Sequence, residues 1–103
     1  GEDGDFMRKV ELLQILDEMI PRILRLNPEV LIVTGDHSTP AVLRSHSWHP
    51  VPVCVYAADC RPDRVHRFGE RTCLKGALGP RFPARDLMLL ALANAGRLNK
   101  YGA

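Results

Sequence analysis

The residues best suited to chemistry in this sequence are two adjacent metal-binding side chains, Asp36 and His37. Gly35 precedes them and lets the backbone turn sharply, so that side chains that would point to opposite faces of a strand can converge on one centre. His46 follows nine residues after His37, beyond a segment that has room for little more than one helical turn at 40–44. The chain must therefore fold back here, which brings His46 toward Asp36 and His37. One carboxylate and two imidazoles suit manganese, zinc or iron better than calcium.

A structural role for the same residues is the alternative. Asp36 could make an Asx bond in a turn, and His37 could cap a following helix. Ser38 or Thr39 would then be the N-cap of that helix, and Pro40 its first residue. The pattern of residue types alone leaves both interpretations open.

The neighbouring segments predict an α/β fold. Residues 30–33 form an unbroken apolar run, which is typical of a strand buried on both faces, as in a parallel sheet under helices. In such sheets the ligand site lies beyond the carboxyl ends of the strands, where Asp36 and His37 follow. Residues 51–57 alternate after two prolines and predict a second strand that leads away from the site.

A long core helix is predicted before the first strand. Asp5 is placed to cap its N-terminus, and Asn27 with Pro28 to end it. Pro21 is expected to kink the helix or to begin a second short one. Apolar residues recur at steps of three and four along one broad stripe, namely Phe6, Val10, Leu13, Leu16 and Ile20, widened by Leu12, Ile15, Met19 and Ile23. A stripe this broad needs cover on more than one side, so we expect the helix to flank a sheet.

The second half of the chain predicts a short strand at 65–68, a loop at 72–83 and a final helix. This helix begins at 84–85 and frays near Gly96 and Gly102. One of its faces gathers Leu87, Leu90, Ala91 and Asn94.

Composition limits the protein class. The chain has 103 residues, 46% hydrophobic and 25% charged, which is typical of at most one small globular domain or of a piece of a larger core. No apolar run approaches the ~20 residues that span a bilayer, and no signal peptide is recognisable, so we expect a soluble cytoplasmic protein without a membrane partner. The three cysteines lack zinc-site spacing, which favours reduced thiols.

Basic residues are concentrated between residues 61 and 85. Seven of them lie there: Arg61, Arg64, Arg67, Arg71, Lys75, Arg81 and Arg85. The segment has few aromatic residues and no recognition motif, which argues against nucleic acid as a partner. A solvated face is the favoured interpretation, and the same charge would help to attract a phosphorylated anion. His66 in this segment has no ligands near it and is expected to be exposed.

Several segments resemble one known family. TGDHSTP and HSWHPVPV around the candidate ligands, and RLNKYGA at the end, resemble the cofactor-independent phosphoglycerate mutases of the archaeal type, within the alkaline phosphatase superfamily. GEDGDF, RFGERTCLKGALG and RDLMLLALANAGR are similar to family segments in the same order. The resemblance runs from Gly1 to Ala103.

The resemblance implies the C-terminal part of an alkaline phosphatase-like three-layer α/β/α sandwich with a mostly parallel sheet. It implies that residues 1–103 are the C-terminal portion of the metal-binding domain, and that the missing N-terminal part of the same protein is its partner. The implied activity is interconversion of 3-phosphoglycerate and 2-phosphoglycerate through a phosphoserine, in glycolysis and gluconeogenesis. The implied cofactors are two divalent ions, Mn²⁺ first, with Zn²⁺, Co²⁺ or Mg²⁺ as alternatives, and no 2,3-bisphosphoglycerate.

The resemblance also implies the metal ligands. Asp36 and His37 match the ligands of the ion that binds the nucleophilic serine, and His46 matches a ligand of the other ion. Glu2 stands where the family has a metal ligand, commonly a histidine. The serine itself belongs to the family's earlier segments, so no catalytic residue is expected in this chain, which alone should be inactive. His49 is expected at the surface.

Two other functions remain alternatives. A metal-dependent phosphohydrolase of the same superfamily would share the ligand motif and release phosphate. A non-catalytic metal-binding or interaction module would fold and bind a partner alone. Substrate-binding residues are not identifiable, and a homo-oligomer stays open.

Overall fold

The computed structural model describes residues 1–99, which divide into two compact units. The first unit combines Gly1–Asn27 with Gly35–Val51. The second combines Pro28–Thr34 with the described residues from Pro52 onward. All four predicted metal ligands fall in the first unit.

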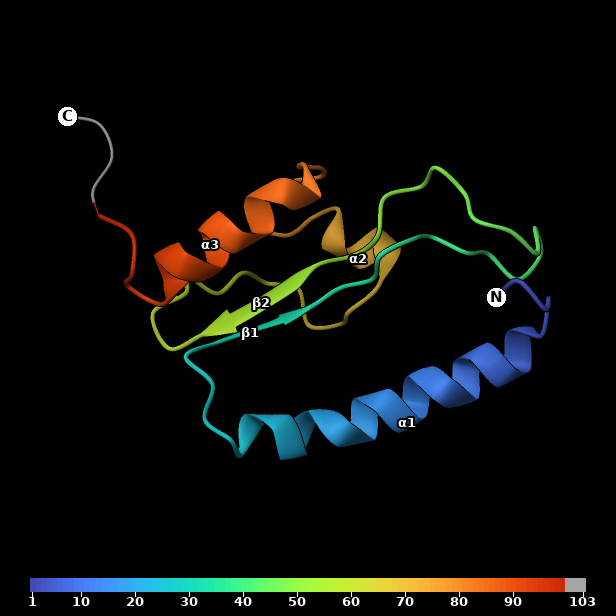
Figure 1. The fold of residues 1–103 in the computed structure, drawn as a ribbon, viewed down its shortest axis with the longest axis horizontal. Coiled ribbons are helices and arrows are strands. Elements are labelled where there is room, and N and C mark those ends of the chain that lie inside the picture. The colour runs from blue at the N-terminus through green and yellow to red at the C-terminus, as the bar shows by residue number, and fades with distance from the viewer. Residues whose placement is uncertain (100–103) are drawn as a thin grey trace. The chain divides into compact units, whose positions relative to one another are not determined.

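The first unit contains the long helix α1, Phe6–Leu24 (Figure 1). Asp5 is its N-cap as predicted, and its carboxylate accepts the Arg8 backbone N–H at 2.9 Å. This bond satisfies one of the donors that a helix start leaves unpaired. The helix runs through Pro21 to Leu24 as one element, so of the two outcomes predicted at Pro21, a kink or a second helix, the second helix does not form. Asn27 then takes a positive φ of 52° after the helix has ended.

The second unit contains a two-stranded sheet of β1, Val30–Val33, and β2, Cys54–Ala57 (Figure 1). The strands pair antiparallel, with Val30 opposite Ala57 and Val33 opposite Cys54. The predicted strand at 30–33 is confirmed, but all four of its residues are only half-buried, so the prediction of burial on both faces is wrong for this chain. Among residues 1–99 no parallel strand pair forms. The three-layer sandwich with its parallel sheet stays a prediction for a larger domain.

The remainder of the second unit holds the short helix α2, Glu70–Cys73, the 3₁₀ helix η1, Ala84–Asp86, and the helix α3, Leu87–Asn94. The final helix is thus confirmed, and it contacts β1. Its predicted face is half-buried, whereas Met88 and Leu89 are exposed. Gly96 follows it with a φ of 67°, and Gly102 lies outside the described residues.

Two predictions between β2 and η1 need correction. Residues 65–68 are not a strand, because the Val65 backbone N–H donates to the Asp63 carboxylate at 2.8 Å in place of a strand partner. The predicted loop at 72–83 begins inside α2. The same Asp63 carboxylate also accepts the Ala77 N–H at 2.7 Å, which joins the two ends of this segment. His66 is exposed as predicted.

Very little of this chain is buried. Ala41 and Ala57 are its only buried hydrophobic residues among those described, and the three cysteines are free thiols, as predicted. Eight large apolar side chains on α1 are exposed: Phe6, Met7, Leu12, Leu13, Ile15, Leu16, Met19 and Leu24. We name these eight residues the α1 apolar face. Exposed apolar surface on this scale is typical of a surface that another part of a protein covers.

Within residues 1–99, no helix combines the length and apolar character needed to cross a bilayer.

Candidate metal-binding site

The segment 35–51 folds back on itself and forms the candidate site. A single turn begins at Pro40, whose carbonyl accepts the backbone N–H groups of Leu43 at 3.0 Å and Arg44 at 3.2 Å. The Ser47 N–H then donates to the Ser38 carbonyl at 2.8 Å, which closes the return. The predicted helical turn and the predicted return of the chain are both confirmed.

This return places His46 beside His37. The centroids of the two imidazole rings are 4.7 Å apart and their planes are tilted by 34°. His46 Nδ1 lies 2.9 Å from the Thr39 hydroxyl oxygen. The predicted approach of His46 to the Asp36–His37 corner is therefore confirmed.

Asp36 lies at the start of the fold-back, with its carboxylate 91% exposed. One carboxylate oxygen accepts the His37 backbone N–H at 2.8 Å, and the other lies 4.0 Å from His37 Nε2. The backbone hydrogen bond is the main reason why the pKa of Asp36 lies below its usual value of 3.8. Asp36 is therefore ionised at neutral pH, as a metal ligand must be.

The capping interpretation accounts for only part of this geometry. Asp36 does make a local hydrogen bond to the backbone, as a turn aspartate would. Residues 40–44, however, form a single turn that does not continue into a helix, so Ser38 and Thr39 have no helix to cap. The Thr39 hydroxyl instead contacts His46.

Glu2 reaches the same place from the start of the chain. Its carboxylate lies 3.4 Å from His46 Nε2. The tight turn at 1–4, in which the Gly4 N–H donates to the Gly1 carbonyl at 3.1 Å, holds Glu2 beside the fold-back. Thus Glu2 and His46 form one oxygen and imidazole pair, and Asp36 and His37 form another.

These residues fit part of a two-ion site. Each pair offers the mixed oxygen and nitrogen ligands that Mn²⁺ or Zn²⁺ accept. No group of three His, Cys, Asp or Glu side chains in residues 1–99 is arranged to hold one ion. Each pair would therefore need further ligands from beyond the described residues.

Two neighbours of the site were not predicted from the sequence. Lys9 Nζ donates to the Thr39 carbonyl at 2.6 Å and ties α1 to the fold-back. Thr39 itself was considered only as a helix cap. The spacing of Lys9 within α1 carried no signal of this contact, because the partner lies thirty positions away.

His49 is exposed, as predicted. Its Nδ1 lies 2.9 Å from the Ser47 hydroxyl, and its ring stacks on Trp48 with centroids 4.3 Å apart. These contacts hold the exposed His49 side chain against Ser47 and Trp48.

Comparisons with known proteins identify relatives of this chain. A model of the Metalloenzyme superfamily matches residues 1–94. Proteins named as probable 2,3-bisphosphoglycerate-independent phosphoglycerate mutases match all 103 residues, with 53% identity in Thermosipho africanus and 52% in Thermus thermophilus. A solved structure of a protein from Pyrococcus horikoshii matches the whole chain with a TM-score of 0.91 and 39% identity. The chain spans 25% of the length of these two curated relatives and 32% of the solved chain.

Proposed function

This chain belongs to the Metalloenzyme superfamily, and we propose that it is the C-terminal part of a phosphoglycerate mutase that works without 2,3-bisphosphoglycerate. The observation that supports this most directly is the convergence of His37, His46 and Glu2 in a sequence about half identical to proteins carrying that name. The substrates are then 3-phosphoglycerate and 2-phosphoglycerate. The protein acts in glycolysis and gluconeogenesis, in the cytoplasm.

Four residues of this chain supply metal ligands in the proposal. Asp36 and His37 hold one divalent ion, and His46 and Glu2 hold the other. Manganese fits this donor set, because carboxylate oxygens and imidazole nitrogens are both ligands that it accepts. When bound, the two ions neutralise charge on the transferring phosphoryl group and lower the pKa of an attacking serine hydroxyl.

The ionised state of Asp36 suits this role. The N–H of His37 favours the charged form of its carboxylate, so no proton has to leave before an ion binds. The centroids of the two imidazole rings are 4.7 Å apart, so the two ligand pairs are adjacent but separate.

The remainder of the protein completes the site and the fold. The serine that accepts the phosphoryl group, the other ligands and the groups that hold the substrate come from the part of the protein before this chain. That part also covers the α1 apolar face, which this chain leaves exposed. Together they form the three-layer α/β/α sandwich.

The test is phosphoglycerate interconversion by the full-length protein, coupled to enolase, with Mn²⁺ and without 2,3-bisphosphoglycerate. We expect activity that EDTA abolishes and that Asp36→Asn and His46→Ala both lose. The matched control Asp59→Asn, an exposed aspartate of the second unit, should retain it. Phosphate release without interconversion would replace the mutase by a phosphohydrolase. A folded, metal-loaded protein with neither activity would refute both.

A further inference from the structure

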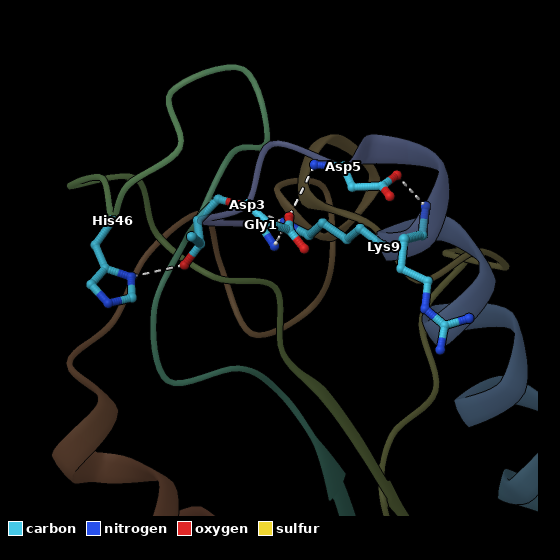
Figure 2. Close-up of polar contacts among 7 residues, drawn as sticks. Gly1, Asp3, Asp5, Lys9 and His46 are labelled. Atoms are coloured by element: carbon cyan, nitrogen blue, oxygen red, sulfur yellow. Dashed lines mark hydrogen bonds and ion pairs between the residues drawn. The ribbon is translucent and has the colours of Figure 1, made fainter.

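We propose that Thr39 and Lys9 are positioning residues for His46, and that the Thr39 hydroxyl holds the imidazole ring so that its Nε2, beside Glu2, can bind a metal ion. The inference deepens the proposed function, since it rests on His46 being a ligand. Figure 2 shows Lys9 reaching from α1 toward the segment that carries His46.

The two ring nitrogens of His46 have different surroundings. Nδ1 lies 2.9 Å from the Thr39 hydroxyl oxygen, and Nε2 lies 3.4 Å from the Glu2 carboxylate. A metal ion needs a nitrogen with a free lone pair, and beside Glu2 that nitrogen is Nε2. The ring proton must then be on Nδ1, where the Thr39 oxygen accepts it. Metal-binding histidines commonly have such a partner on their second nitrogen.

His46 needs this support because its ring is largely open to solvent. Its side chain is 56% exposed, so packing alone does not fix its orientation. The contact with the Thr39 hydroxyl fixes the rotation of the ring.

Lys9 holds Thr39 in turn. Its Nζ donates to the Thr39 carbonyl at 2.6 Å in a partly buried contact. Gly1 packs against the same carbonyl so closely that a Cβ at Gly1 would lie 2.5 Å from the Thr39 oxygen. Thr39 is therefore fixed from two sides, by α1 and by the segment that carries Glu2.

The experiment is calorimetric titration of the full-length, metal-free protein with MnCl₂, following the site that His46→Ala removes. Thr39→Val keeps the shape and loses the hydroxyl, and we expect ~10- to 100-fold weaker Mn²⁺ binding at that site. Thr39→Ser restores the hydroxyl and should bind like wild type. Lys9→Met should give a smaller loss. The controls Thr72→Val and Lys75→Met change the same residue types in the second unit and should leave the affinity unchanged.

A second measurement reads the hydrogen bond on Nδ1 directly. In the Zn²⁺-loaded protein labelled with ¹⁵N-histidine, the wild-type spectrum should show the ring proton of His46 on Nδ1 in slow exchange with solvent, and Thr39→Val should make that exchange faster. Equal Mn²⁺ affinity of wild type and Thr39→Val, while His46→Ala binds weakly, would overturn the inference and leave the proposed function standing. Equal affinity in His46→Ala would overturn both. Loss of affinity in Thr39→Val from a protein without mutase activity would support the inference and refute the proposed function.

Discussion

The imidazole rings of His37 and His46 lie 4.7 Å apart by their centroids, although the two residues are nine positions apart in the sequence. A helix or strand would not bring two such positions together in this way. The turn at Pro40 and the bond from Ser47 to Ser38 do so. The candidate site of this chain is therefore a loop whose shape is fixed by backbone hydrogen bonds.

Glu2 should be replaceable by histidine but not by alanine. Glu2→Ala removes the proposed ligand beside His46 Nε2, and we expect at least ~10-fold weaker Mn²⁺ binding in the full-length protein. Glu2→His supplies the residue common in the resembled family and should retain most of the affinity. Glu18→Ala on α1 is the control. If Glu2→Ala binds Mn²⁺ like wild type, Glu2 is not a ligand.

Asp63 should tie together the segment between β2 and α3 only while it is ionised. The backbone N–H groups of Ala77 and Val65 hold its pKa below the usual 3.8. The stabilisation is therefore complete above pH 3.8 and is lost as the pH falls through the lowered folded-state pKa. At pH 7 we expect faster amide hydrogen exchange at Ala77 in Asp63→Asn than in wild type.

The pH dependence distinguishes loss of the Asp63–Ala77 hydrogen bond from a general destabilisation of the segment. The difference between wild type and Asp63→Asn should shrink at acidic pH, because wild-type Asp63 is then protonated as well. Asp17→Asn on α1 should exchange like wild type at Ala77. A difference that stays constant down to low pH would exclude the carboxylate as its cause.

Replacing Gly4 by alanine should lower the free energy of unfolding more than the same change at Gly79. Both have positive φ, 77° and 84°, so alanine is strained at either position, at a cost of about 1–2 kcal/mol. At Gly4 a Cβ would also lie 2.5 Å from Arg44 Nε, whereas nothing lies within 4 Å at Gly79. Chemical denaturation of the full-length variants should show the larger loss of unfolding free energy in Gly4→Ala. Equal losses would mean that Arg44 moves aside freely.

The α1 apolar face should behave as buried surface in the full-length protein. Leu16 is 50% exposed in this chain, but under a covering segment Leu16→Ala should lower the free energy of unfolding by about 2–5 kcal/mol. Gln14→Ala on the same helix should change it by less than about 0.5 kcal/mol. If both variants unfold like wild type, no other part of the protein covers this face.

Local signals in the sequence predicted the elements well. The carboxylate of Asp5 and the apolar spacing along 6–24 predicted α1, and the run at 30–33 predicted β1, because these signals act within a few residues. The fold-back at Pro40 was predicted from the short sequence separation between His37 and His46. The predictions that were wrong concern what surrounds an element in the folded chain. Burial of β1 depends on what packs against it, and a short apolar run has the same sequence in a covered sheet and in an open one.

Contacts between distant residues were beyond the reach of sequence patterns. Lys9 looks like an ordinary helix surface residue, and only the folded chain brings its ammonium group to the Thr39 carbonyl. The strand predicted at 65–68 failed for a related reason. Asp63 takes the Val65 N–H with its side chain, which competes with the ladder that a strand would need.

Glu2 and His46 come from opposite ends of the first unit, and β1 lies between those ends in the chain. This order has a consequence for folding kinetics. The two proposed ligands can meet only after a long loop has closed, and the entropy of that closure is lost before any ion can bridge them. An ion added during refolding should therefore leave the early rate of folding unchanged and slow the unfolding of the finished state, since it binds a pair that exists only there.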